Sequence, residues 1–353
     1  MQKTQQAYKH LIAVLLKADN SFLDEKHMLD EQGKVDGYRH LLDLLAYGVD
    51  FYVNNDPLNP NWARLATPYR KILGDNVDSV YHFSQLQAGQ RYRIRGWRHN
   101  SVYQSFAVYA GKPDGTASDH VSITVNHNEI EYGDDGGFEI YFTSDPKEKN
   151  EFKLDDDAIC IISREYFSDP VAGMEAELYI DNMSDNPSPM PLSDEQLATR
   201  INTLSNFIES TLQIVPFPIP LPQNGFSPAF FFPKEQKSWG LTDNAYCFGR
   251  FEIQDDEYLE LRFSSPPAVY WGVQVWNHMM QSMDYVHHKV SINMNQAKPN
   301  KDGSFTIKVS KAHMDDTNWF STGGYNSGVI FCRWLLPDGM PEQPVMELKK
   351  IGS

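Results

Sequence analysis

The sequence predicts a mainly β protein: two tandem jelly-roll-like antiparallel β-sandwiches with an N-terminal helical region and a connecting helix. Three observations predict this fold. Apolar residues alternate with period two over two long segments, Asp-Gly-type turns break that alternation, and the two segments repeat each other. We expect a helical region over 1–70, a first sandwich over 71–182, a linker with a helix and a proline-rich strap over 183–240, and a second sandwich over 241–353.

The first part of the chain has helical periodicity. Over residues 35–53 apolar side chains recur at helical spacing, and a shorter amphipathic stretch covers 5–17. The pairs Asp56-Pro57 and Asn59-Pro60 end the longer helix. Because the apolar stripes are uninterrupted and not basic, we interpret these helices as a cap on the first sandwich. The alternative is a partner-binding or membrane-lying arm.

A second helical segment joins the two β segments. Ser193 and Gln196 have the spacing of a capping box, which opens a helix over 194–214. Prolines then alternate with large apolar residues at Pro216, Pro218, Pro220 and Pro222. We interpret this strap as an extended connector laid over a core, with a ligand for an SH3-type domain as the alternative.

An internal repeat relates the two strand-rich segments. One gap-free shift of 167 positions aligns several strands together with the turns between them, and chance similarity of β patterns would not keep that register. We therefore infer a duplication and predict that 77–180 and 244–348 superpose as one fold. The matched pairs include Arg95 with Arg262, Tyr103 with Tyr270, Tyr109 with Trp276, Asn126 with Asn293 and, after a further slip of two, Arg164 with Arg333.

Composition and charge exclude several classes of protein. An apolar fraction of 41% supports large cores and excludes intrinsic disorder, and a net charge of −16 makes the protein acidic. That charge disfavours nucleic acid and anionic membranes as partners. The longest early apolar run, residues 11–16, is too short for a secretory signal or a membrane span, so we expect a soluble, cytoplasmic protein. Cys160, Cys247 and Cys332 have no Cys-x-x-Cys spacing, and we interpret them as reduced, buried thiols.

Two groups of motifs resemble a known family. The first half contains Asp75-Asn76-x-Asp78-Ser79-Val80-Tyr81, Arg93-Ile94-Arg95-Gly96 and Ser105-Phe106-x-Val108-Tyr109; the second contains Ser291-x-Asn293-x-x-Gln296 and Asn318-Trp319-x-x-Thr322-Gly323-Gly324 leading to Arg333-Trp334. These segments resemble the family called domain of unknown function 1214, whose members often pair it with the related domain of unknown function 1254. The resemblance implies jelly-roll-like sandwiches and implies no reaction or catalytic residue. Where members of the family have Gly-His, this chain has Gly324-Tyr325.

The sequence offers little for metal or cofactor chemistry. The histidines of the second repeat are His278, His287, His288 and His313. The adjacent pair would point to opposite faces of a strand, so both cannot hold one ion, and no His-x-His with a carboxylate is present. Loops for nucleotide phosphates, a Gly-x-Ser-x-Gly nucleophile turn and the full spacing of a calcium loop are missing as well. We therefore expect no metal and no cofactor.

The alternation of side chains along a strand points to a candidate site in the second repeat. Over 270–277, Trp271, Val273 and Val275 share one face, while Tyr270, Gly272, Gln274 and Trp276 share the other. This polar-aromatic face suits a neutral or anionic organic ligand; the alternative is the wet face of a sheet or the seam between the two sandwiches. The candidate ligand-binding residues are Tyr270, Trp276, Asn293, Gln296, Asn318, Trp319 and Tyr325.

Two further residues are candidates for catalysis. We expect Tyr270, Trp276, Asn293 and Arg262 to line one concave surface, with Asp284 near its edge. The first hypothesis is a small-organic-molecule site at which a metal-independent enzyme uses Asp284 and Arg262 in general acid–base chemistry. The alternative is a non-catalytic ligand-binding or assembly module. We expect a small organic ligand as partner, no nucleic acid and no membrane, and the sequence leaves a homo-oligomer open.

Overall fold

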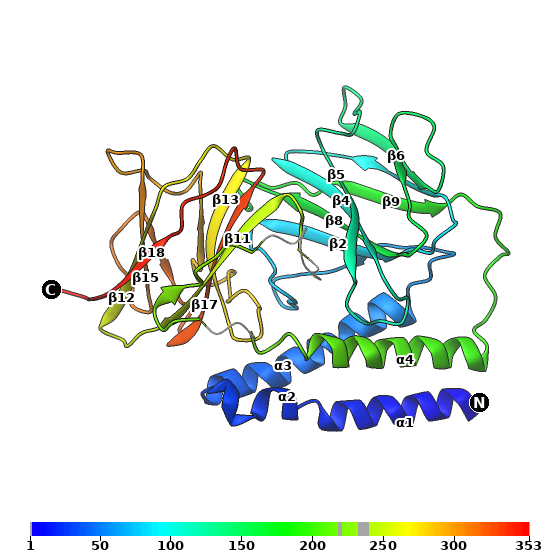
Figure 1. The fold of residues 1–353 in the computed structure, drawn as a ribbon, viewed down its shortest axis with the longest axis horizontal. Helices are drawn as coiled ribbons and strands as arrows, with labels where there is room; N and C mark the ends of the chain where they lie inside the picture. The colour runs from blue at the N-terminus through cyan, green and yellow to red at the C-terminus, as the bar shows by residue number, and fades with distance from the viewer. Residues whose placement is uncertain (1, 218–220, 232–239, 353) are drawn as a thin grey trace.

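A computed structural model describes residues 2–217, 221–231 and 240–352 of the chain. Figure 1 shows two β-rich halves side by side, with a layer of helices running beneath them. Each half contains one five-stranded and one four-stranded sheet, which confirms the mainly β fold predicted from the sequence.

The first half occupies the middle of the chain. Its five-stranded sheet has the order β1 (Ala63–Arg64), β2 (Ser79–Gln85), β8 (Ala158–Tyr166), β4 (Tyr103–Ala110) and β5 (His120–Asn126). Its four-stranded sheet has the order β7 (Glu151–Lys153), β6 (Gly137–Thr143), β3 (Tyr92–Trp97) and β9 (Glu177–Asn182). Alternate apolar residues of both sheets, such as Phe106, Ile94 and Ile140, fill the core between them.

The second half repeats this arrangement. Its five-stranded sheet has the order β10 (Gly225–Phe226), β11 (Asn244–Glu252), β17 (Ser327–Leu335), β13 (Tyr270–Trp276) and β14 (Ser291–Asn293). Its four-stranded sheet has the order β16 (Trp319–Ser321), β15 (Phe305–Ser310), β12 (Glu257–Phe263) and β18 (Val345–Lys350). The core contains Trp271, Val273 and Val275, the face of β13 that the sequence predicted to be buried.

The strand registers confirm the duplication. Corresponding strands take the same place in the two halves. In each half one edge strand of the four-stranded sheet pairs in parallel with its neighbour: β7 with β6, and β16 with β15. The predicted equivalences hold residue by residue: Ser105 pairs with Asn126 as Gly272 pairs with Asn293, and Arg95 pairs with Glu139 as Arg262 pairs with Thr306.

The helices form a layer that contacts both halves. They are α1 (Gln2–Lys17), α2 (Asn20–Leu23), a 3₁₀ turn (Glu25–His27), α3 (Glu31–Gly48), which continues into a π-helical turn (Val49–Val53), and α4 (Asp194–Thr211). Helix α4 begins with the predicted capping box of Ser193 and Gln196 and runs beside α1 (Figure 1). The N-terminal helices do not cap the first half alone, which corrects our expectation. From α3, Asp43 accepts a hydrogen bond from Gln281 of the second half at 2.9 Å.

The segment after α4 runs toward the second half. Phe217 donates its backbone N–H to the carbonyl of His278 at 2.9 Å, and Phe217 and Leu221 pack on an aromatic cluster of the second half. These contacts fit the predicted connector; residues 218–220 of the strap, like 232–239, lie outside the described residues. The three cysteines are free and buried. The motif Thr322-Gly323-Gly324 forms a turn in which the two glycines have positive φ angles of 67° and 92°.

The two five-stranded sheets face each other across a seam, where reciprocal hydrogen bonds join them. Asp78, just before β2, accepts bonds from Tyr270 (2.7 Å) and Asn293 (2.9 Å) of the second half. Asp243, just before β11, accepts bonds from the equivalent Tyr103 (2.7 Å) and Asn126 (3.0 Å) of the first half. The two copies therefore pack against each other through two equivalent contacts, each between an aspartate of one half and a tyrosine and an asparagine of the other.

Candidate functional site

Three of the predicted site residues lie together, at the seam. Tyr270, Trp276 and Asn293 are each at most 1% exposed, and all three bond to the first half. Trp276 donates its indole N–H to the carbonyl of Asp75 at 3.0 Å, and the other two bind Asp78. The alternation along β13 thus identified the non-core face correctly, and that face is the seam between the halves.

The two predicted catalytic residues lie elsewhere, which corrects our expectation of one concave surface. Arg262 is on β12, in the other sheet of the sandwich, where its side chain is 61% exposed and pairs with Glu260 at 2.6 Å. Asp284 lies in the loop after β13, and its exposed carboxylate pairs with His287 at 2.7 Å. Because β12 and β13 belong to different sheets, their side chains cannot share the seam.

The remaining four predicted residues make contacts in separate places. Exposed Gln296 accepts a hydrogen bond from the backbone of Asn293 (3.0 Å), and Asn318 joins Lys298 to Thr306. Trp319 donates to Ser310 at 2.7 Å, and Tyr325 donates to Asp36 of α3 at 3.1 Å. The structure does not bring these residues together.

The seam instead contains a cavity of about 530 Å³. Trp276 is the one predicted site residue among the described residues that line it. The cavity lies between the two halves and the helical layer, and its walls are mostly apolar. Aromatic side chains from all three parts contribute, among them Phe51, Phe83, Phe207, Phe248, Trp276 and Phe331. This inter-half cavity is the candidate site.

The lining of the inter-half cavity follows the duplication. In the first half Tyr81 pairs with Arg164 across β2 and β8, and in the second half Tyr246 pairs with Arg333 across β11 and β17. Two positions further along, Phe83 pairs with Ile162 as Phe248 pairs with Phe331, and all eight side chains line the cavity. Each copy therefore contributes one tyrosine, one arginine and two apolar side chains from equivalent positions.

Two arginines stand in this apolar lining. Arg164 and Arg333 are 5% and 3% exposed. Arg164 donates to the hydroxyl of Tyr109 at 2.6 Å; Arg333 donates to the carbonyl of Gly74 at 3.2 Å. The Arg333 guanidinium also lies 4.6 Å from the centre of the Phe331 ring, a cation–π contact. Among the described residues, no carboxylate lies within ion-pair distance of Arg333.

Phenol hydroxyls beside the arginines add further donors. The hydroxyl of Tyr246 accepts hydrogen bonds from Leu241 N (3.3 Å) and Asn244 Nδ2 (2.9 Å), and that of Tyr166 accepts from Asn244 Nδ2 (3.2 Å) and Arg333 (3.5 Å). Within residues 2–217, 221–231 and 240–352, neither hydroxyl donates to an acceptor. Burial raises the pKa of Tyr246 to about 12, so this phenol keeps its proton at neutral pH.

Guanidinium N–H groups and phenol O–H groups all donate hydrogen bonds. The polar part of the cavity wall therefore favours a group that accepts several hydrogen bonds and carries negative charge, such as a carboxylate. The carboxylate of Asp75, which also belongs to the lining, is already engaged: one oxygen accepts from Ser282 N (2.9 Å) and the other from Ser282 Oγ (2.6 Å).

The sequence carried a signal for the two arginines that our reasoning did not use. The sequence of a central strand that is covered on both faces is a continuous run of apolar residues. Arg164 and Arg333 interrupt such runs at equivalent positions of the two copies, after Ile161-Ile162-Ser163 and Ile330-Phe331-Cys332. The two arginines are also a matched pair of the repeat, after the slip of two positions.

The described residues offer few alternatives to this site. No three His, Cys, Asp or Glu side chains among them are grouped as metal ligands would be. None of the described helices combines the length and apolarity that a membrane span requires.

Comparisons with known proteins agree with the sequence and the fold. Residues 252–338 match the family described as "Protein of unknown function (DUF1214)", which confirms the resemblance for this part of the chain. The crystal structure of an uncharacterised protein from Burkholderia cenocepacia is similar over 98% of this chain and 97% of that chain, with a TM-score of 0.90 and 24% identity. A second crystal structure, from Vibrio parahaemolyticus, covers 96% of this chain and 100% of that one, with a TM-score of 0.51 and 11% identity. No curated protein matches the chain. These two proteins share the fold of this chain, and their descriptions give no ligand.

Proposed function

We propose that the protein binds an amphipathic organic anion, with a carboxylate head and an apolar body, in the inter-half cavity. One observation carries the proposal: Arg333 is buried in an apolar cavity where Asp75 and Asp78 attract it only from beyond ion-pair distance, and its equivalent Arg164 lines the same cavity. A buried guanidinium is costly unless a counter-charge satisfies it. A ligand carboxylate supplies that charge and accepts two parallel hydrogen bonds from the guanidinium.

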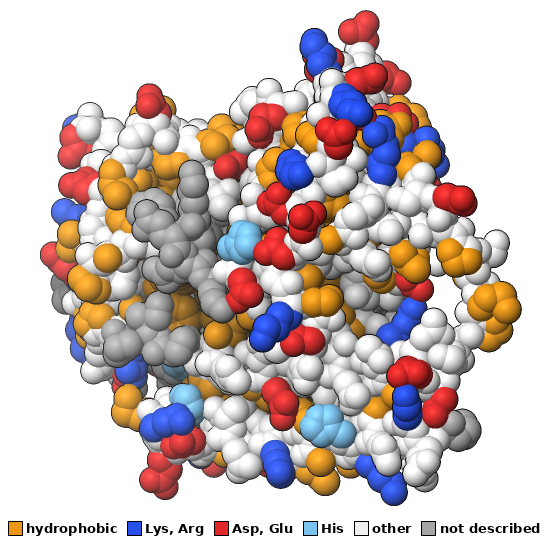
Figure 2. Space-filling view, turned by 45° about the vertical axis from the view of Figure 1, so that its right-hand side comes forward, with side chains coloured by type: hydrophobic (Ala, Val, Ile, Leu, Met, Phe, Trp, Pro, Cys, Tyr) orange, Lys and Arg blue, Asp and Glu red, His pale blue; other side chains and the backbone are white. Residues whose placement is uncertain are grey.

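The size and lining of the cavity support a small ligand with an apolar body. Its volume of about 530 Å³ is within the usual range for small-molecule pockets. Contacts with the aromatic walls, such as Phe248 and Trp276, contribute apolar burial. On the face shown in Figure 2, acidic and basic side chains are interspersed and form no basic patch that would attract an anion.

We favour binding over the acid–base enzyme hypothesis. General acid–base catalysis needs a group whose proton-transferring atom is available to the substrate. Asp75 is the one carboxylate among the described lining residues, and both of its oxygens are bonded to Ser282.

A displacement assay tests the proposal. The uncharged fluorophore N-phenyl-1-naphthylamine reports on apolar cavities, and decanoic acid and decanol compete for it with chains of the same length. We expect the wild type to prefer the acid by about tenfold or more, because charge-assisted hydrogen bonds favour it. Arg333→Met should abolish the preference while decanol binding is kept.

The matched control is Arg262→Met, which removes the equally charged but exposed arginine of β12 and should leave the preference intact. If Arg333→Met does not fold by circular dichroism, Arg333→Lys keeps the charge without the planar fork and should reduce the preference. Equal affinity of the wild type for acid and alcohol would show that the arginines do not recognise an anion.

A further inference from the structure

We propose that the ligand has two parts, and that an uncharged hydrogen-bonding end opposite its carboxylate lies in a second, polar pocket beside α4. This inference rests on the proposed function, because the apolar body and the carboxylate are placed in the inter-half cavity. It adds the class of ligand: a chain or ring system that is anionic at one end and carries hydroxyl or amide groups at the other.

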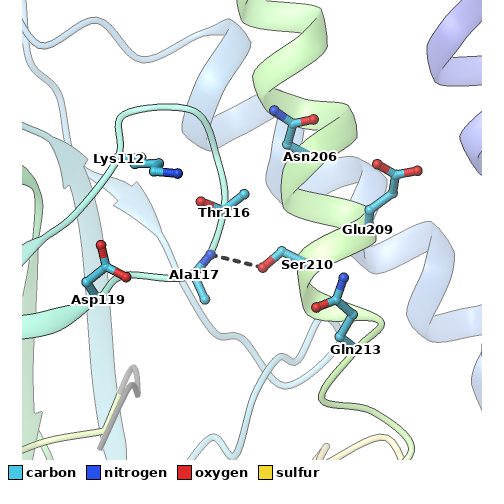
Figure 3. A pocket seen from close by; sticks show the side chains of 8 residues that line it. All are labelled: Lys112, Thr116, Ala117, Asp119, Asn206, Glu209, Ser210 and Gln213. Carbon is cyan, nitrogen blue, oxygen red and sulfur yellow. Dashed lines mark hydrogen bonds between the residues drawn. The ribbon is translucent and has the colours of Figure 1, made fainter.

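The second pocket, here called the outer pocket, has a volume of about 340 Å³. Figure 3 shows that it lies between the loop over residues 111–119 and the C-terminal part of α4. The loop contributes Lys112, Thr116 and Asp119, and the helix side contributes Asn206, Glu209 and Gln213. Every described lining residue except Ala117 carries a polar group on its side chain, in contrast to the aromatic walls of the inter-half cavity.

The two spaces adjoin each other. Ala117, Ser210 and Gln213 line both the outer pocket and the inter-half cavity. At this junction the backbone N–H of Ala117 donates to Ser210 Oγ at 2.9 Å, the bond drawn in Figure 3. We place the far end of a long ligand beyond these three shared residues, among the polar side chains of the outer pocket.

The loop that forms one wall is held in place. Asp114 accepts hydrogen bonds from the N–H (3.0 Å) and the hydroxyl (2.6 Å) of Thr116, and its carbonyl accepts from Asn206 of α4 at 2.9 Å. Gly115 lies so close to α4 that an added Cβ would come within 2.0 Å of the Thr203 carbonyl. The outer pocket is thus built by specific contacts between the loop and the helix.

The charges of the outer pocket select its occupant. Asp119 is engaged in a contact of its own, and among the other described lining residues the carboxylate of Glu209 and the ammonium of Lys112 balance each other, so no surplus positive charge favours a second anionic group. The side-chain amide of Gln213 is exposed and has no hydrogen-bond partner in the part of the chain that the structure describes. It offers both a donor and an acceptor. These features favour an uncharged hydroxyl or amide.

The experiment uses two series of straight-chain acids, from octanoic to tetradecanoic acid, one plain and one with a terminal hydroxyl opposite the carboxylate. Each acid displaces N-phenyl-1-naphthylamine from the wild-type protein. In short acids the hydroxyl should weaken binding by about tenfold, because it is buried unpaired among aromatic side chains. Above a certain chain length this loss of affinity, the hydroxyl penalty, should disappear, because the hydroxyl then reaches the outer pocket.

Gln213→Leu should restore the penalty for the long hydroxy acids, since it removes the amide and keeps the size of the side chain. The matched control is Asn202→Leu, an exposed position of the same helix that lines neither space. As a second variant, Ala117→Leu narrows the junction and should weaken only the long hydroxy acids.

The outcomes separate the two proposals. If no acid of either series displaces the fluorophore, the proposed function itself is overturned. If plain acids displace it but the hydroxyl penalty persists at every length, the two-part ligand is overturned and the proposed function stands.

Discussion

Burial gives one carboxyl of the first half an unusual environment. Glu165 is 1% exposed and follows Arg164 on β8, so its side chain points away from the inter-half cavity. One carboxylate oxygen accepts from Ala176 N at 2.8 Å, and the other has no hydrogen-bond partner among the described residues. Burial raises the pKa of Glu165 to about 7, so its proton comes off only near neutral pH.

We predict that Glu165 makes stability depend on pH between its ordinary pKa of 4.5 and about 7. In that window the folded protein keeps a proton that the unfolded chain has lost, so the free energy of unfolding falls as pH rises. Glu165→Gln should remove this fall, and relative to wild type it should gain about 1–3 kcal/mol between pH 4.5 and pH 8. Urea denaturation across this range measures the difference.

Glu148→Gln, a change at an exposed glutamate, serves as the control and should follow the wild-type curve. Parallel pH profiles for Glu165→Gln and wild type would contradict the prediction.

At the scale of elements, the reciprocal aspartates explain how the two copies dock. Each sits just before the first long strand of its own half and accepts a tyrosine hydroxyl and an asparagine amide from the other half. The side chains that the sequence assigned to a ligand wall, Tyr270 and Asn293, thus have protein partners. Their role in the fold is to hold the seam closed around the cavity.

We predict that Asp78→Ala lowers the free energy of unfolding by about 1–3 kcal/mol, because two buried donors lose their acceptor. Once Asp78 is replaced, adding Tyr270→Phe should cost little more, since the hydroxyl no longer has its partner. Urea denaturation of the single and double variants gives the coupling energy.

The same cycle built on Asp243 and Tyr103 is an internal comparison, and the duplication implies a coupling energy of the same sign. Strictly additive costs in both cycles would show that these bonds do not couple the halves.

At the scale of the whole molecule, the shared contacts imply that the two halves depend on each other. The helical layer bonds to both halves, and one apolar cluster joins Phe51 and Phe207 of the helical segments to Phe83 and Met279 of the two halves. Aromatic side chains from all three parts line the inter-half cavity. Neither half buries its seam face without the other.

We predict a single cooperative unfolding transition. The helical signal at 222 nm reports on the helices of the N-terminal region and the connecting segment. Tryptophan emission reports on seven side chains, four of which belong to the second half: Trp271, Trp276, Trp319 and Trp334. Both signals should change at the same urea concentration. Decanoic acid at about 100 times its Kd should stabilise the protein by about 2.7 kcal/mol.

The control for this stabilisation is Arg333→Met, which at the same acid concentration should lose about half of the effect or more, because its affinity for the acid falls by the tenfold preference or more. Two transitions separated in urea would show that the halves fold independently and that the seam contributes little.

The fold class, the duplication and the faces of single strands can all be predicted from the amino-acid sequence. These features follow from local or periodic patterns: alternation placed Trp271 in the core and Tyr270 on the opposite face, and the capping box of Ser193 and Gln196 placed the start of α4. Pairing of equivalent residues, such as Ser105 with Asn126 and Gly272 with Asn293, follows from the unbroken register of the repeat.

What covers each face of a strand depends on how the sheets pack together. Alternation fixes a side chain relative to its own strand, but it does not say which sheet the strand joins or what packs against that sheet. Arg262 and Tyr270, close in sequence, therefore lie in different sheets, whereas Arg164 and Arg333, 169 residues apart in the sequence, line one cavity. The candidate site exists because the two copies bury equivalent faces against each other, and that contact is made by long-range packing, which no local pattern encodes.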